Sequence, residues 1–231
     1  KAQDGASCVT YIGPNGAGKT TLFNLLTGVY EPSEGTVTLD GHLLNGKVPY
    51  KIAALGLGRT FQNIRLFKDL SVLDNVLIAF GNHHKAHVLA SFLRLPAYYK
   101  NEEELKAKAL ELLKIFDLDK EAETLAKNLA YGQQRRLEIV RALATEPKIL
   151  FLDEPAAGMN PQETAELTAL IRRIKNEFNI TIMLIEHDMS LVMEVTERIY
   201  VLEYGRLIAH GTPDEIKNDK RVIEAYLGGE A

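Results

Sequence analysis

The chain has 231 residues, of which 46% are hydrophobic and 25% are charged, ordinary values for a globular protein with a substantial core. The formal net charge is −4 and there is no long basic run, so the electrostatic signature of a nucleic-acid-binding protein is missing. Cys8 is the only cysteine, which excludes a disulfide within the chain, and no apolar run approaches the roughly 20 residues of a membrane-spanning helix.

A glycine-rich segment follows the first predicted strand, residues 8–12, and fits the pattern G-x-x-x-x-G-K-[ST]. Because glycine tolerates positive φ, such a backbone can turn its N–H groups inward around a phosphate. Lys19 would reach the β- and γ-phosphates, Thr20 would bind Mg²⁺, and a helix predicted over 22–27 would direct its positive end at the same anion. The sequence therefore predicts a nucleotide site made of Gly13, Pro14, Asn15, Gly16, Ala17, Gly18, Lys19, Thr20 and Thr21.

The middle of the chain changes from strands to helices. Residues 36–39 and 57–61 predict short strands, whereas the pattern from 71 to 145 is mostly helical. Ser71 is suited to cap one helix, and Asn101, with Glu104 three residues on, predicts the start of another. Because strand-like segments lie on both sides, we predict a helical subdomain (71–145) inserted into one domain whose core is 1–70 and 146–231.

The C-terminal part predicts further strands. Residues 149–152 and 180–185 are apolar runs that are too short for helices and are typical of strands buried on both faces of a parallel sheet. Residues 198–202 and 206–209 predict a β-hairpin, and 213–227 predict helix. Strands that alternate with helices predict an α/β fold, here a three-layer P-loop NTPase core with a mainly parallel sheet, antiparallel strands and the helical insertion.

Polar side chains follow the two buried strands, at the edge of the sheet where ligands bind. Asp153 and Glu154 end the first run, and His187 follows the second. Asp153 would hold Mg²⁺ opposite Thr20, and Glu154 would orient or deprotonate an attacking water. His187 would donate a hydrogen bond to the γ-phosphate. The alternatives are a charged pair at a strand exit and a structural histidine.

In their order, these motifs resemble the ATP-binding subunits of ABC transporters, and the resemblance extends from Gly13 to Leu227. It implies that Gln62, which has no intrinsic marker of its own, is the lid glutamine that contacts the metal or its water and senses the membrane subunit. It implies catalytic roles for Glu154, His187 and Lys19. It also implies that the partner subunit completes each ATP site in trans through Leu129, Ala130, Tyr131, Gly132 and Gln133.

That last segment departs from the usual Leu-Ser-Gly-Gly-Gln. Ala130 replaces the serine whose hydroxyl contacts the γ-phosphate, so we expect backbone N–H groups at the start of a helix over Gln133 to Thr145 to act instead. Asn160 stands where the family usually has aspartate, and it is equally suited to cap a helix. These departures, together with the ending at 222–228, resemble the ATP-binding proteins of branched-chain amino acid importers.

The resemblance implies an ATPase that uses ATP and Mg²⁺, forms a homodimer or a heterodimer with a related subunit, and drives integral membrane permease subunits. It would lie peripherally at the cytoplasmic face of the inner (plasma) membrane and bind no nucleic acid. The alternatives are an ATPase subunit of a lipid or lipopolysaccharide exporter, a non-transport ABC switch, and a regulatory ATP-binding module without turnover.

Two expectations concern smaller features. The family carries an aromatic residue upstream of the phosphate loop that stacks on adenine, and Tyr11, inside a predicted strand, is a poor substitute, so we expect a trimmed chain. His83, His84 and His87 have no nearby acid or cysteine and predict a polar loop rather than a metal site.

Overall fold

The computed structural model describes residues 7–80 and 96–227, and for residues 96–101 it describes the backbone alone. The chain divides into two compact units, unit 1 (Lys1–Gln62 with Lys148–Ala231) and unit 2 (Asn63–Pro147). Unit 2 begins before the predicted boundary at 71 because the loop ahead of the first helix is tied to that helix. The side chain of Asn75 donates to the carbonyl of Phe67 at 3.0 Å and accepts its N–H at 3.0 Å. The predicted boundaries of the inserted subdomain remain a prediction.

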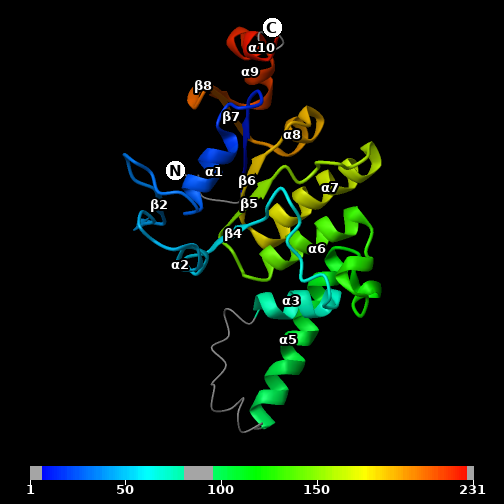
Figure 1. Ribbon diagram of the computed structural model, residues 1–231. Helices are drawn as coiled ribbons and strands as arrows, with labels where there is room; N and C mark the ends of the chain where they lie inside the picture. Colours follow the sequence, from blue (N-terminus) through cyan, green and yellow to red (C-terminus); the bar gives the residue numbers. More distant parts are fainter. Residues whose placement is uncertain (1–6, 81–95, 228–231) are drawn as a thin grey trace. The chain divides into compact units, whose positions relative to one another are not determined.

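The described part of unit 1 contains a six-stranded sheet with the strand order β4-β5-β6-β1-β7-β8 (Figure 1). Neighbouring strands are parallel except for the antiparallel hairpin of β7 and β8. The strand bounds are β1 Cys8–Ile12, β4 Leu57–Arg59, β5 Ile149–Asp153, β6 Thr181–Ile185, β7 Arg198–Glu203 and β8 Arg206–Gly211. A separate small sheet pairs β2 (Thr38–Leu39) with β3 (His42–Leu43).

Local sequence accounts for these strands. The unbroken apolar run of β5 is buried along almost its whole length, as predicted for a strand covered on both faces. The hairpin turn uses Tyr204 and Gly205, both with positive φ (45° and 75°), which is the backbone that a two-residue hairpin loop requires. The predicted central strands and the predicted hairpin are therefore confirmed.

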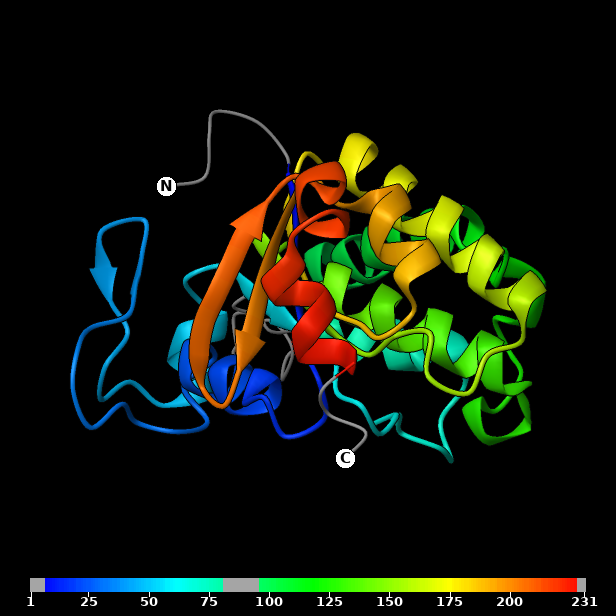
Figure 2. The same ribbon diagram turned by 90° about the horizontal axis from the view of Figure 1, so that it is seen from above.

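Helices cover both faces of this sheet. Helices α1 (Lys19–Leu26) and α2 (Pro49–Ala53) bury Phe23 and Ile52 against Phe151 and Ile185 on one face. On the other face, Val192 of α8 (Met189–Val195) packs with Ile216 and Val222 of α9 (Pro213–Lys217) and α10 (Lys220–Leu227). Figure 2 shows the red α10 next to the orange hairpin that it contacts. The predicted layered α/β fold is confirmed.

Helix α7 (Pro161–Phe178) begins where the sequence predicts. Asn160 accepts the N–H of Glu163 at 3.0 Å, and the Glu163 carboxylate accepts the N–H of Asn160 at 2.9 Å. This is a reciprocal cap, which satisfies two N–H groups that a helix start leaves unpaired. Asn160 therefore has the structural role that its sequence position allows.

Unit 2 is helical in its described part, with α3 (Val72–Phe80), α5 (Pro96–Ile115) and α6 (Tyr131–Leu143) in mutual contact. Ser71 caps α3 by accepting the N–H of Asp74 at 3.0 Å, as predicted. The predicted helix start at Asn101 is wrong, because α5 already begins at Pro96 and Asn101 lies inside it. Proline suits the first helical position, since the N–H that it lacks has no partner there, and this signal outweighed the capping pattern.

Candidate functional site

The phosphate loop lies between the end of β1 and the start of α1. Gly13, Gly16 and Gly18 have φ of 152°, 79° and 95°, a backbone that side chains other than glycine rarely adopt. The first turn of α1 contains no acidic residue, and Thr20 is exposed at its start. The helix therefore offers its positive end to an anion and the exposed Thr20 hydroxyl to a cation bound to that anion.

Lys19 is held against this loop. Its Nζ donates to the carbonyls of Gly13 at 2.7 Å and Pro14 at 3.0 Å, and the residue is 6% exposed. Burial lowers the pKa of Lys19, and the charge of Glu154 opposes that shift. The ammonium group and this carboxylate therefore lie within electrostatic reach of each other, and the strands that precede them, β1 and β5, flank β6 in the same sheet.

Asp153 is almost fully buried at the end of β5, with 3% of its surface exposed. Its Oδ2 lies 3.2 Å from Nη2 of Arg59, which comes from β4 and also donates to the hydroxyl of Thr27 at 2.5 Å. The guanidinium balances the charge of Asp153, which would otherwise be costly at this depth. Arg59 was missed by the sequence reasoning, although a cation in a short apolar strand was an available signal.

Glu154, Gln62 and His187 come together at the same sheet edge. Nε2 of Gln62 donates to Oε2 of Glu154 at 2.9 Å, and Nε2 of His187 lies 2.9 Å from Oε1 of the same carboxylate. Glu154 adopts a left-handed backbone with φ of 47°, which is unusual for a side chain of this size. Such strained residues concentrate at functional sites. Gln62 and His187, which follow two predicted strands, thus both contact the carboxylate of Glu154, which follows a third.

The segment expected to act in trans lies in unit 2. Ala130 has an extended backbone and precedes α6, so the helix begins at Tyr131 rather than at the predicted Gln133. The side chain of Gln133 reaches back to accept the N–H of Ala130 at 3.1 Å, which fixes this earlier start. Tyr131 is 45% exposed, and its hydroxyl accepts a hydrogen bond from Nη2 of Arg135 at 3.4 Å.

Other candidates have separate outcomes. Tyr11 stacks on Tyr200 with a ring separation of 5.3 Å, so its ring is already engaged inside unit 1. His83, His84 and His87 lie outside the described residues. Within 7–80 and 96–227, no group of three or more metal-binding side chains occurs.

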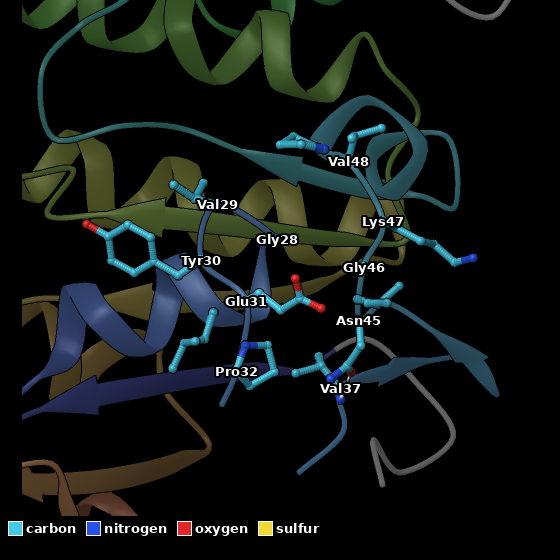
Figure 3. A pocket seen from close by; sticks show the side chains of 13 residues that line it. Gly28, Val29, Tyr30, Glu31, Pro32, Val37, Asn45, Gly46, Lys47 and Val48 are labelled. Carbon is cyan, nitrogen blue, oxygen red and sulfur yellow. Dashed lines mark hydrogen bonds between the residues drawn. The ribbon is translucent and has the colours of Figure 1, made fainter. Parts of the chain in front are cut away.

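A hollow of about 250 Å³ lies elsewhere in unit 1, between the end of α1 and the start of α2. Its walls come from residues between Leu25 and Pro49, with Val29, Tyr30 and Val48 among them. Figure 3 shows the Glu31 carboxylate directed across it towards Gly46. Because its lining includes none of the strand-end residues, this hollow is separate from the phosphate loop.

Comparison with protein families identifies an ABC transporter model over residues 5–157 and a branched-chain amino acid ATP-binding cassette transporter model over residues 206–231. Among curated proteins, the chain is 49% identical to the branched-chain amino acid transport ATP-binding protein BraF of Pseudomonas aeruginosa, over 95% of this chain and 86% of BraF. It is 50% identical to LivG of Salmonella typhimurium with the same coverage.

Solved structures agree with the sequence comparison. An ATP-binding cassette of an ABC transporter in its ADP conformation matches with a TM-score of 0.82 and 32% identity, over 97% of this chain and 89% of that one. A nucleotide-free cassette matches with a TM-score of 0.81 and 32% identity, over 96% and 88% of the two chains. Across the described residues, no helix combines the length and apolar character needed to cross a bilayer. With the ABC transporter model matched over residues 5–157 and close relatives along most of its length, this chain belongs to the ABC transporter family, among its ATP-binding proteins.

Proposed function

We propose that this chain hydrolyses ATP to power a membrane transporter that imports branched-chain amino acids. The observation that carries the hydrolysis is the Glu154 carboxylate, held by Gln62 and His187 at 2.9 Å each and within electrostatic reach of Lys19. A carboxylate fixed in this way beside a phosphate loop is suited to orient and deprotonate a water that attacks the γ-phosphate. It would have no comparable use in a module that only binds nucleotide.

Each residue has a task in this proposal. The loop N–H groups and Lys19 bind the phosphates, and His187 contacts the γ-phosphate. Thr20, Asp153 and Gln62 provide oxygen ligands, which fit the preference of Mg²⁺. When bound, Mg²⁺ supplies charge neutralisation on the β- and γ-phosphate oxygens. The charge of the Asp153 carboxylate is also balanced by Arg59.

A second copy of the chain, or a related subunit, would complete the ATP site. The segment from Leu129 to Gln133, which leads into α6, would act in trans on the phosphates bound by the partner's loop, through backbone N–H groups at Tyr131 and Gly132. One support is that a related cassette, 26% identical with a TM-score of 0.75, is described as dimeric and bound to ADP and phosphate.

The dimer would dock on integral membrane permease subunits at the cytoplasmic face of the inner membrane, with Gln62 and the helical insertion 71–145 nearest to them. The cargo proposal has two supports, the names of the relatives and the match of residues 206–231 to a model of branched-chain amino acid cassettes. That match favours an importer over the exporter and non-transport alternatives.

Hydrolysis is tested by phosphate release from the chain assembled with its permease subunits. Glu154→Gln should lower kcat by roughly 10²–10⁴-fold, because it removes the proposed general base, while ATP affinity persists. The matched control is Glu177→Gln, an exposed acid of α7 that pairs with Arg173, and it should hydrolyse ATP like the wild type. An unchanged kcat in Glu154→Gln would contradict the proposed role.

The cargo is tested separately in vesicles that contain the assembled transporter and the matching binding protein. Uptake of radiolabelled leucine, isoleucine or valine should require ATP and stop in the Glu154→Gln transporter. Glutamate serves as the control cargo. ATP hydrolysis without uptake of any branched-chain amino acid would refute the cargo while leaving the ATPase proposal intact.

A further inference from the structure

Glu186 is a buried acid that contacts the backbone of two different loops. Its Oε1 accepts the N–H of Ala156 at 2.8 Å, and its Oε2 accepts the N–H groups of His187 at 2.9 Å and Asp188 at 3.2 Å. Only 3% of the residue is exposed. Both oxygens of one carboxylate therefore hold backbone amides, one from the loop after β5 and two from the loop after β6.

These two loops carry the residues that we place in the reaction. Ala156 lies two residues after Glu154, in a turn that the N–H of Ala157 closes by bonding to the Glu154 carbonyl at 3.1 Å. His187 directly follows Glu186, and its ring meets the Glu154 carboxylate at 2.9 Å. The contacts thus form a closed ring that runs from Glu154 through its turn to Glu186, then to His187 and back to Glu154.

A carboxylate at this position is costly for the fold. Burial raises the pKa of Glu186, the nearby charge of Glu154 raises it further, and the three backbone hydrogen bonds act in the opposite direction. An apolar side chain would avoid the burial of a charge but would leave three N–H groups without an acceptor. The environment of Glu186 is therefore unfavourable for its charge, but its hydrogen bonds fix the backbone of two loops.

We propose that Glu186 is a positioning residue for ATP hydrolysis, which holds the left-handed turn at Glu154 and the loop of His187 so that the two side chains stay in contact. This inference rests on the hydrolysis proposed above. The hydrogen bonds of Glu186 within the described residues go to Ala156, His187 and Asp188, and none goes to the phosphate loop or to Lys19. Its loss should therefore lower kcat and leave ATP affinity unchanged.

The first test measures kcat, KM and ATP affinity for Glu186→Gln and Glu186→Asp in the assembled transporter. A glutamine keeps the shape but presents an N–H₂ group to the backbone amides, so kcat should fall by up to about 10²-fold, the effect of a displacement near 1 Å at a reacting group. Glu186→Asp should lose less. The matched control is Glu215→Gln in α9. The carboxylate of Glu215 also accepts a backbone N–H, that of Thr212 at 2.8 Å.

A double-mutant cycle separates positioning from a general loss of structure. If Glu186 acts through Glu154, then adding Glu186→Gln to Glu154→Gln should slow single-turnover hydrolysis no further. If the role of Glu186 were merely structural, Glu186→Gln would instead lower the melting temperature, and its effect on the rate would add to that of Glu154→Gln. Full additivity would overturn the inference.

Amide hydrogen exchange of the wild-type protein gives a test that no folding defect can obscure. The N–H groups of Ala156 and His187 should exchange slowly, because both are donated to a buried acceptor. Rapid exchange at either position would overturn the inference. If the wild type hydrolyses ATP and both Glu186 variants have the same kcat as the wild type, this inference alone is overturned. A wild-type protein without hydrolysis would overturn the proposed function and the inference together.

Discussion

Alanine substitutions at Gly13 and Gly16 should separate a glycine that the fold needs from one that the ligand needs. A Cβ on Gly13 would lie 2.1 Å from the backbone carbonyl oxygen of Leu202 on β7 and 3.1 Å from Cβ of Ala17. A Cβ on Gly16 would meet no atom within 4 Å. Both glycines have positive φ, so the difference between them is mainly one of space.

The contacts give the expected size of each effect. At Gly13, overpacking against backbone costs about 1–3 kcal/mol and the strained φ a further 1–3 kcal/mol, about 4 kcal/mol together. At Gly16, only the cost of a left-handed backbone remains, about 1–2 kcal/mol. For a chain of this size, 1 kcal/mol lowers the melting temperature by about 2–4 °C. Gly13→Ala should therefore lose about 8–16 °C and Gly16→Ala about 2–8 °C.

ATP binding should show a different order. A methyl group on Gly16 would fill the open side of the loop, so affinity should fall by about tenfold or more, a loss of about 1.4 kcal/mol for each factor of ten. Gly41→Ala is the matched control, because Gly41 has φ of 77° and an equally open Cβ position in the β2–β3 turn. It should lose a similar amount of stability and no ATP affinity.

Thermal unfolding without nucleotide and titration calorimetry with ATP measure the two quantities independently. The reasoning would be refuted if Gly13→Ala melted at the wild-type temperature. It would equally be refuted if Gly16→Ala and Gly41→Ala bound ATP with the same affinity.

Three further outcomes are expected. Asn160→Ala should lower the melting temperature by about 2–4 °C, since a lost helix cap costs about 1 kcal/mol, and an unchanged melting curve would contradict the cap. Burial raises the pKa of Cys8 to about 12, so at mildly alkaline pH a thiol reagent should label it only after unfolding; rapid labelling of the native protein would disprove this. Burial also raises the pKa of Glu186 above the ordinary 4.5, so this group stabilises the fold below pH 4.5 and that contribution is lost as pH rises through the raised pKa. The stability of the wild type relative to Glu186→Gln should therefore decline with rising pH, and a difference that grows with pH would be evidence against it.

The sequence was sufficient for elements whose signal is local. The apolar run of β5, the Tyr204-Gly205 turn and the Asn160 cap each depend on a few neighbouring residues, and the structure has all three. Elements that depend on distant contacts were harder to predict. The start of unit 2 ahead of Ser71 depends on Asn75, a fully buried side chain whose bonds to Phe67 no local pattern reveals.

The candidate site shows the same division, and strand register explains it. Parallel strands bring their carboxyl ends to one edge, so a meeting of the phosphate loop, Glu154 and His187 was predictable. Which residues of neighbouring loops meet depends on the register of the strands. Arg59 lies opposite Phe151, and Phe151 lies opposite Met183. Gln62, Glu154 and Glu186 lie three residues beyond these, past the ends of their strands, where Gln62 bonds to Glu154 and Glu186 bonds to Ala156. Gln62 could be assigned from family resemblance, but Glu186 could not, because its proposed role follows from these contacts and not from its residue type.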